Sequence, residues 1–133
     1  MEIHSEQEML TFGQDLAKKI TPPAVIELIG DVGAGKTTLV RGFAKGLGVK
    51  EPITSPSFTI SKTYALPTGG QLIHYDFYRL DDPGIMLDDL TENLQNPQNL
   101  IIIEWGASVA NILPPHHHRI QIDYTDTGRK VTL

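Results

Sequence analysis

Apolar residues recur along the chain at two spacings, one typical of helices and one of strands. A helical spacing is set by four residues near the N-terminus, which are Met9, Phe12, Leu16 and Ile20. Ser5 and Glu8 precede them in the capping-box pattern, with Ser5 as N-cap and Glu8 reaching back, and Pro22-Pro23 cannot continue a helix. We therefore expect an amphipathic helix that begins at Ser5 and ends before these prolines.

Two short apolar runs, 24–29 and 100–104, predict buried strands. Turn residues and periodicity predict the remaining elements, which are helices at 38–47, around 83–94 and at 107–113, and strands at 58–65, 71–79, 119–124 and 130–133. Strands alternate with helices at first, and hairpins follow in the middle and at the end. The pattern predicts a single domain over 1–133, an α/β three-layer fold with a mixed, mostly parallel central sheet.

Composition supports a compact domain, because 40% of the 133 residues are hydrophobic and 20% are charged. The chain has no cysteine, which excludes disulfides and thiolate metal sites. No apolar run approaches the roughly 20 residues that cross a bilayer. The acidic N-terminus is unlike a signal peptide. We expect a cytoplasmic protein with no membrane partner.

The net charge of −5 argues against a large nucleic-acid surface, which needs clustered basic side chains. The arginines are few and scattered: Arg41, Arg79, Arg119 and Arg129. Residues 81–92 contain five acids and no base. This run fits a solvated face better than a docking surface for a basic partner.

The segment 30–37, Gly-Asp-Val-Gly-Ala-Gly-Lys-Thr, matches every fixed position of the phosphate-loop pattern. Its glycines allow close approach to phosphates, and successive backbone N–H groups hold the anion. Lys36 reaches the outer phosphates and the Thr37 hydroxyl ligates Mg²⁺. The expected nucleotide-binding residues here are Asp31, Val32, Gly33, Ala34, Gly35, Lys36, Thr37 and Thr38. The competing interpretation is an ordinary glycine-rich turn.

A triphosphate site also needs an acid for the metal. Glu104 ends the most apolar strand, and a parallel sheet would place that strand end beside the loop. We therefore favour Glu104 as the metal-binding acid over the alternative, a surface acid at a strand end. Strand alternation places His74 and Asp76 on one face. Asp76 can position the attacking water or support the metal. His74 can equally be a satisfied core histidine.

Three further features stay open. Segment 54–59 can bring a hydroxyl to the metal, as in nucleotide switches, or be a polar loop. Arg79 can pair with nearby aspartates, or meet phosphate or a partner. His116-His117-His118 fits an exposed turn better than a metal cluster, because adjacent histidines cannot all face one ion.

The base of the bound nucleotide is inferred from the absence of a motif. No asparagine is followed by lysine, so the guanine-reading Asn-Lys-x-Asp pattern is absent and we prefer ATP. Two other functions compete with an ATPase. A small-molecule kinase would need an arginine-rich lid. A nucleotide-gated binding module would signal through its bound state without hydrolysis.

Four motifs occur in order: the phosphate loop 30–38, Ser-Pro-Ser-Phe-Thr at 55–59, His-Tyr-Asp-Phe-Tyr-Arg-Leu at 74–80 and Leu-Ile-Ile-Ile-Glu-Trp at 100–105. With them nearly the whole chain resembles the TsaE (YjeE) family of small bacterial P-loop ATPases. The resemblance implies a role in making threonylcarbamoyladenosine at position 37 of tRNA. It implies that ATP hydrolysis acts on the TsaB–TsaD transferase pair, and that tRNA is met through that complex.

Carried over by position, the resemblance implies that residues 31–38 hold phosphates and that Thr37 and Glu104 bind Mg²⁺. It implies that Asp76 supports hydrolysis and that Trp105 lies beside the site. Gly128 or Arg129, and the start of the first helix near Ser5, would lie towards the adenosine. Two positions depart from the family pattern. Ser57 replaces the usual threonine but keeps the hydroxyl for the nucleotide, and Gly106 replaces a common proline or serine.

Overall fold

The computed structural model describes residues 1–31, 33–54, 56, 61–78 and 84–133. Within these ranges, seven strands form one sheet in the order β1-β7-β6-β2-β5-β4-β3. The strands are β1 (Glu2–Ile3), β2 (Ala24–Ile29), β3 (Ser61–Ala65), β4 (Gln71–Asp76), β5 (Leu100–Glu104), β6 (His118–Tyr124) and β7 (Arg129–Thr132).

The centre of the sheet is parallel and its two edges are antiparallel. Strands β6, β2, β5 and β4 run in one direction, with β2 between β6 and β5. Strands β7 and β1 close one edge and β3 closes the other. The expected mixed sheet with a parallel centre is therefore confirmed. Strand β1 was not expected, because two residues are too short to show an alternating pattern.

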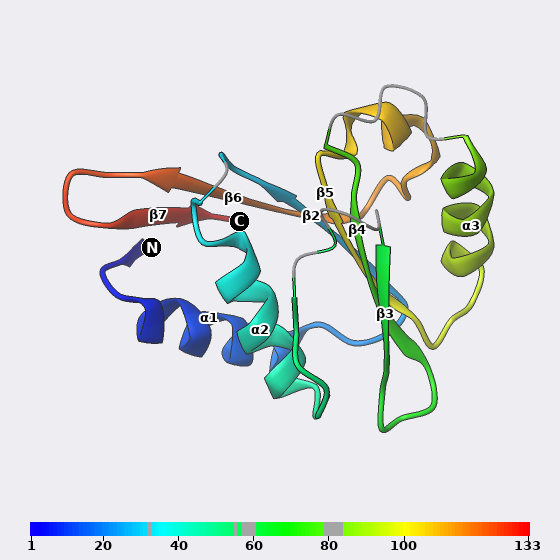
Figure 1. Ribbon diagram of the computed structural model, residues 1–133, viewed down its shortest axis with the longest axis horizontal. Coiled ribbons are helices and arrows are strands. Elements are labelled where there is room, and N and C mark those ends of the chain that lie inside the picture. The colour runs from blue at the N-terminus through cyan, green and yellow to red at the C-terminus, as the bar shows by residue number, and fades with distance from the viewer. Residues whose placement is uncertain (32, 55, 57–60, 79–83) are drawn as a thin grey trace.

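Helices cover both faces of this sheet (Figure 1). On one face lie α1 (Glu6–Lys19) and α2 (Lys36–Gly46), whose apolar residues pack in a core cluster with Ile26 and Leu28 of β2. On the other face lie α3 (Ile85–Leu94) and the 3₁₀ helix η1 (Gly106–Ile112), in a second cluster that includes Val25. The three-layer fold is confirmed, since neighbouring residues of β2 point to opposite layers.

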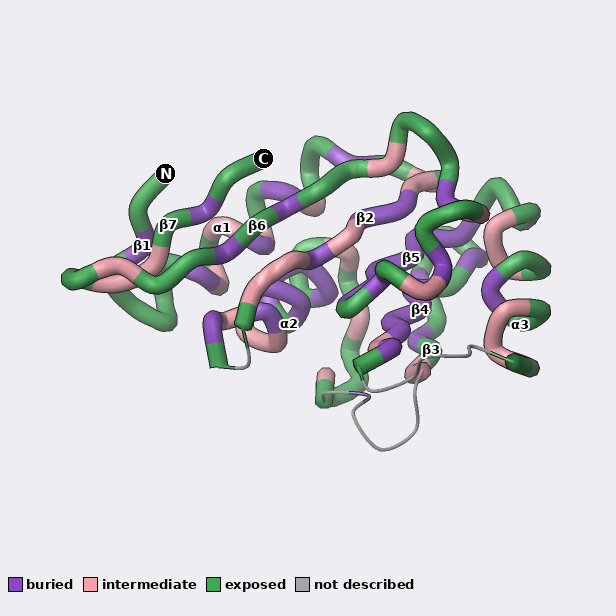
Figure 2. Tube along the Cα trace, turned by 90° about the horizontal axis from the view of Figure 1, so that it is seen from above, coloured by how far each residue is buried: buried purple, intermediate pink, exposed green. Residues whose placement is uncertain are grey.

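Strand β5 is buried along its whole length (Figure 2). Its apolar run has no polar alternation because helices cover both sides, as the sequence pattern indicated. Its last residue, Glu104, is charged, unlike the four apolar residues before it, and is only 4% exposed. A carboxylate buried at a strand end requires partners, and these define the site described below.

The N-terminus of α1 is capped almost as expected. The Ser5 hydroxyl accepts a hydrogen bond from the Glu8 N–H at 3.1 Å. The Glu8 carboxylate reaches back to the His4 N–H at 2.7 Å, one residue earlier than a capping box would place it. This bond ties the end of β1 to the first turn of α1, so the unexpected strand and the expected helix are held together.

Several element ends differ from the expectation. Strand β4 ends at Asp76 rather than Arg79, because the Asp76 carboxylate accepts the Tyr78 N–H at 2.9 Å and turns the chain. Helix α2 begins at Lys36, two residues before the expected start, and residues 106–112 form a 3₁₀ helix. Residues 58–60 of the strand expected over 58–65, and residue 83 of the helix expected around 83–94, lie outside the described residues. No helix among the described residues is long and apolar enough to cross a bilayer.

Helices α1 and α2 approach so closely that glycine is required at their crossing. A Cβ on Gly42 would lie 2.2 Å from the Leu10 carbonyl oxygen, and one on Gly13 would lie 2.4 Å from the Leu39 carbonyl oxygen. Both neighbours are helix backbone, which cannot rotate away as a side chain can. The crossing fixes α1 against the helix that carries Lys36.

Gly42→Ala should therefore force the two helices apart and lower the free energy of unfolding by about 1–3 kcal/mol or more. Lys45→Ala is the matched control, because Lys45 is exposed on the same helix and should change stability by less than about 0.5 kcal/mol. Urea unfolding followed by circular dichroism measures both. Equal stability of Gly42→Ala and the native protein would contradict the close crossing.

Candidate nucleotide site

The glycine-rich loop lies between the end of β2 and the start of α2, at the carboxyl edge of the parallel strands. Gly33 and Gly35 have φ values of +81° and +109°. These left-handed conformations are costly for residues with a Cβ, so the glycines set the course of the loop. The loop connects the buried strand β2 to the helix α2.

The first turn of α2 presents free backbone donors to the loop. Its N-cap is Gly35, which provides no side-chain acceptor, and the first turn contains no acid. The first N–H groups of any helix lack intrahelical acceptors and carry the positive end of the helix dipole. Thr37 and Thr38 lie in this turn and are half-buried. The arrangement favours an anion at this point.

Lys36 is a buried cation at the foot of the loop, with only 6% of the residue exposed. Its Nζ donates to the Gly30 carbonyl oxygen at 2.6 Å and lies 3.5 Å from Glu104 Oε1. The ammonium also lies 4.4 Å from the centroid of the Trp105 ring. A carbonyl, a carboxylate and an aromatic face compensate the burial of the charge.

Glu104 has a different partner on each carboxylate oxygen. Oε1 faces Lys36, and Oε2 lies 2.5 Å from Nε2 of His74. Burial alone would raise the pKa of Glu104, but the hydrogen bond from His74 and the charge of Lys36 outweigh it and lower that pKa. Glu104 is therefore an ionised carboxylate in a nearly dry site.

Asp76 stands beside Glu104, because the two residues are register partners at the ends of β4 and β5. The Asp76 carboxylate accepts the Tyr78 N–H, and the Phe77 N–H bonds the Glu104 carbonyl oxygen at 3.0 Å. The parallel pairing thus brings together two acids that are far apart in the sequence. The sequence pattern placed Glu104 at a strand end but Asp76 within a longer strand, so their pairing is seen only in the structure.

Trp105 follows Glu104 in a left-handed conformation with φ of +57°. Among the described residues, it is the one non-glycine residue with a positive φ. Such a conformation costs on the order of 1–3 kcal/mol. The strain sets the ring over Lys36 and against Tyr78, whose ring centroid lies 4.8 Å away. Trp105 is 36% exposed, so this aromatic pair forms the outer wall of the lysine site.

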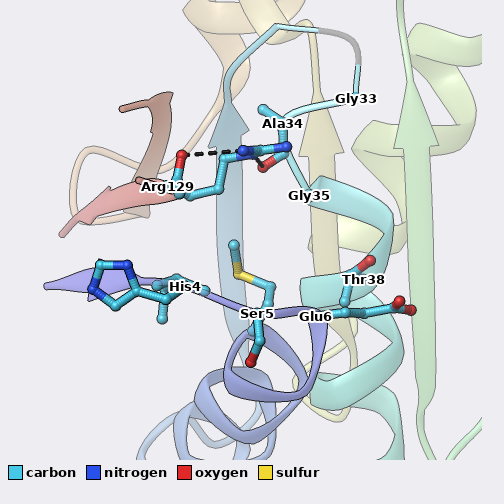
Figure 3. A pocket seen from close by; sticks show the side chains of 11 residues that line it. His4, Ser5, Glu6, Gly33, Ala34, Gly35, Thr38 and Arg129 are labelled. Atoms are coloured by element: carbon cyan, nitrogen blue, oxygen red, sulfur yellow. Dashed lines mark hydrogen bonds between the residues drawn. The ribbon is translucent and has the colours of Figure 1, made fainter. Parts of the chain in front are cut away.

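A hollow lies beside the glycine-rich loop (Figure 3). It has a volume of about 360 Å³, and the residues lining it are Ile3, His4, Ser5, Glu6, Met9, Gly33, Ala34, Gly35, Thr38, Gly128 and Arg129. Arg129 forms one wall, where its Nε donates to the Ala34 carbonyl oxygen at 3.2 Å and its Nη1 to the Gly128 carbonyl oxygen at 3.0 Å. The start of α1 forms the opposite wall (Figure 3).

The walls of this hollow come from both ends of the chain. His4 Nδ1 lies 3.2 Å from the Thr127 carbonyl oxygen, and the Met1 ammonium donates to the Val131 carbonyl oxygen at 3.1 Å. Gly128 lies in the turn between β6 and β7, as the Thr125 N–H bonds its carbonyl oxygen at 3.0 Å. The resemblance implied that the start of the first helix near Ser5 lies here, but sequence reasoning did not assign His4 or Met9 to the hollow, because the pairing of β1 with β7 and the crossing of α1 and α2 bring them to the loop.

Other expected positions fall elsewhere. Val32, Ser55, Ser57 and Arg79 lie outside the described residues, so their expected roles stay predictions. Thr54 is described, and its hydroxyl accepts a hydrogen bond from Lys62. Of the three histidines, His117 bonds Glu27 Oε1 at 3.1 Å, while His116 and His118 are exposed.

The fold and the site together define a class. A mixed three-layer α/β domain, in which a central strand leads through a glycine-rich loop into a helix that starts with a buried lysine, is a P-loop NTPase-like protein.

Known proteins narrow this class to one family. The profile of the family described as "Threonylcarbamoyl adenosine biosynthesis protein TsaE" matches residues 3–131. The tRNA threonylcarbamoyladenosine biosynthesis protein TsaE of Streptomyces coelicolor is 37% identical over 86% of this chain and 78% of its own length. The Haemophilus influenzae protein of the same name is 35% identical over 98% of this chain and 85% of its own length. The chain belongs to the TsaE family of tRNA threonylcarbamoyladenosine biosynthesis, as its motifs indicated.

A solved structure supports the same fold. The crystal structure of Bacillus subtilis YdiB matches this protein with a TM-score of 0.79 and 32% sequence identity. The match covers 98% of this chain and 80% of the YdiB chain. The likeness extends over the whole sheet and its helices, and so includes the antiparallel edges that single motifs did not specify.

Proposed function

We propose that this protein binds ATP with Mg²⁺ at residues 30–38 and hydrolyses it, and that hydrolysis acts on the TsaB–TsaD transferase pair. In this role it would support threonylcarbamoylation of adenosine 37 of tRNA in the cytoplasm. The observation that carries the proposal is Lys36, buried at the start of α2 between the Gly30 carbonyl and Glu104. A buried lysine at the N-terminal turn of a helix is suited to a polyphosphate.

The loop would hold the phosphates through its own backbone. The backbone N–H groups of the first turn of α2 would face the phosphates, and Lys36 would exchange its bond to Gly30 for the outer phosphate oxygens. The ammonium would keep its place near Glu104 by a small rotation of a flexible side chain. Binding energy then comes from donors already fixed by the fold, and little reorganisation is needed.

Two oxygen donors fit a magnesium ion. The Thr37 hydroxyl lies in the first turn of α2, and the ionised Glu104 carboxylate lies at the adjacent strand end. Mg²⁺ prefers such hard oxygen ligands and keeps several waters. When bound, it would neutralise charge that develops on the phosphate oxygens. Thr37 and Glu104 are therefore the residues we assign to it.

Asp76 is assigned to the attacking water. Its carboxylate is half-buried beside Glu104, and the hydrogen bond from the Tyr78 N–H fixes its orientation. An acceptor held at this place can orient a water through one oxygen. Since the described part of the chain offers few candidate catalytic groups, we expect slow hydrolysis by the protein alone. Partner binding would then accelerate it.

The hollow beside the loop suits the adenosine. It opens from Gly33 and Thr38, at the foot of the phosphate-binding helix, and reaches to Gly128. Its volume of about 360 Å³ lies in the range of small-molecule sites. The walls carry the apolar Met9 and the Ser5 hydroxyl together with the polar side chains of Glu6 and Arg129, and these groups can contact a base and a ribose. The acidic net charge of −5 also fits a subunit that meets tRNA through partners.

Arg129→Met should lower ATP affinity about 5- to 10-fold, because the loop loses its hydrogen bond at Ala34 and one wall of the hollow loses its polar edge. Lys130→Met is the matched control, since Lys130 is the next residue of β7 and is exposed. Isothermal titration calorimetry with ATP and Mg²⁺ measures both. Equal affinities in the two variants would show that Arg129 does not support the loop.

Isotope transfer from γ-labelled ATP tests the reaction type. In the proposed function the label appears in inorganic phosphate. Label on a small metabolite would instead identify a kinase, and ATP binding without any label release would identify a nucleotide-gated binding module. Absence of ATP binding would contradict the proposed function altogether.

A further inference from the structure

His74 is wholly buried in β4, with 0% of the residue exposed, and its Nε2 lies 2.5 Å from Glu104 Oε2. Among the described residues this is the one hydrogen bond of its ring, since Nδ1 is buried without a described partner. A core histidine with a purely structural role would be expected to use both nitrogens. Among the described residues, the His74 ring therefore makes its one hydrogen bond to Oε2 of Glu104.

With the hydrogen bond from His74, the two oxygens of the Glu104 carboxylate have different partners. With Oε2 held by His74, Oε1 is directed to Lys36 at 3.5 Å. Glutamate has several rotatable bonds, and holding it in one rotamer costs on the order of 1–2 kcal/mol of side-chain entropy. Without the bond, the carboxylate would be free to rotate, and Oε1 would lose its fixed position at the end of β5.

We propose that His74 is a positioning residue that fixes the orientation of the Glu104 carboxylate and so presents Oε1 at a set position for Mg²⁺. The inference rests on the proposed function and adds to it a residue that touches neither nucleotide nor metal. Partners of metal ligands set ligand orientation, and their loss typically costs about 10- to 100-fold in metal affinity. The alternative is that His74 only satisfies a buried carboxylate and serves stability.

Three variants separate these roles. His74→Phe keeps the ring and removes the donor. His74→Gln places an amide N–H near the position of Nε2, whereas the shorter His74→Asn does not reach it. Tyr75→Phe is the matched control on the same strand, because it removes hydrogen bonds to Asp89 and Asn93 on the opposite face of the sheet. It should lower stability and leave Glu104 in place.

The experiment titrates Mg²⁺ into each protein saturated with a non-hydrolysable ATP analogue, by calorimetry, with thermal unfolding of each variant measured in parallel. We expect His74→Phe and His74→Asn to weaken Mg²⁺ binding about 10- to 100-fold, and His74→Gln to restore most of it. Tyr75→Phe should bind Mg²⁺ as the native protein does, despite a lower unfolding temperature.

Equal Mg²⁺ affinity in the glutamine and asparagine variants would overturn the inference, and this comparison remains decisive if His74→Phe does not fold. Native-like Mg²⁺ binding by a folded His74→Phe would overturn it as well. Failure of the native protein to bind the analogue is a separate result, because it would contradict the proposed function itself.

Discussion

Replacement of Lys36 by alanine is expected to lower ATP affinity about 10- to 100-fold, more than any other single change in the loop. Lys36 is the buried ammonium at the start of α2, and no other lysine or arginine of the described residues takes its place beside Glu104. A hydrogen bond to a charged partner contributes about 1.5–3 kcal/mol, which corresponds to this loss of affinity.

The same variant has a second expected effect. Without the ammonium, His74 is the one remaining side-chain partner of the buried Glu104 among the described residues, so the cost of its charge rises. Stability of the nucleotide-free protein should fall in consequence. Lys45→Ala on the same helix is the control, because it removes an exposed lysine of equal length. Unchanged ATP affinity of Lys36→Ala by calorimetry would contradict the assignment of the phosphate site.

Glu104→Gln is expected to lower the rate of ATP hydrolysis about 100-fold or more and to change ATP affinity far less. Glutamine keeps the shape of the side chain and removes the charge that we assign to Mg²⁺. The loop N–H groups and Lys36 remain, so phosphates can still bind. A loss of rate with retained binding would separate the metal ligand from the phosphate cradle.

Glu27→Gln is the matched control for Glu104→Gln. Glu27 lies on the neighbouring strand β2, where it pairs with His117 at 3.1 Å and Arg119 at 3.4 Å. Its loss should leave hydrolysis unchanged. Phosphate release under saturating ATP measures both variants. If Glu104→Gln loses hydrolysis and still complements in cells, binding alone suffices and the protein is a nucleotide-gated module.

The central part of the fold could be predicted because its signals are local. The apolar runs 24–29 and 100–104 are buried on both faces, and the glycines between β2 and α2 have the conformations that only glycine adopts easily. Glu104 could be placed beside the loop because a buried strand in a parallel sheet ends at the edge that carries the loop. These features depend on spacing within a few residues.

The remaining features depend on pairing between distant segments. Strand β1 and the hollow beside the loop exist because the two ends of the chain pair through β1 and β7. The end of β4 was placed too late, since the bond from the Tyr78 N–H to Asp76 overrides an alternation that continues in the sequence. The role of His74 was left open because no local pattern reveals that its one partner lies on β5.

The most direct test of the central claim is ATP hydrolysis by the purified protein with Mg²⁺, measured alone and then with the TsaB–TsaD pair and tRNA. We predict low activity alone that rises when the partners are added, and that is lost in both conditions with Glu104→Gln. Absence of hydrolysis in either condition, with ATP still bound, would contradict an ATPase and leave a nucleotide-gated binding module in its place.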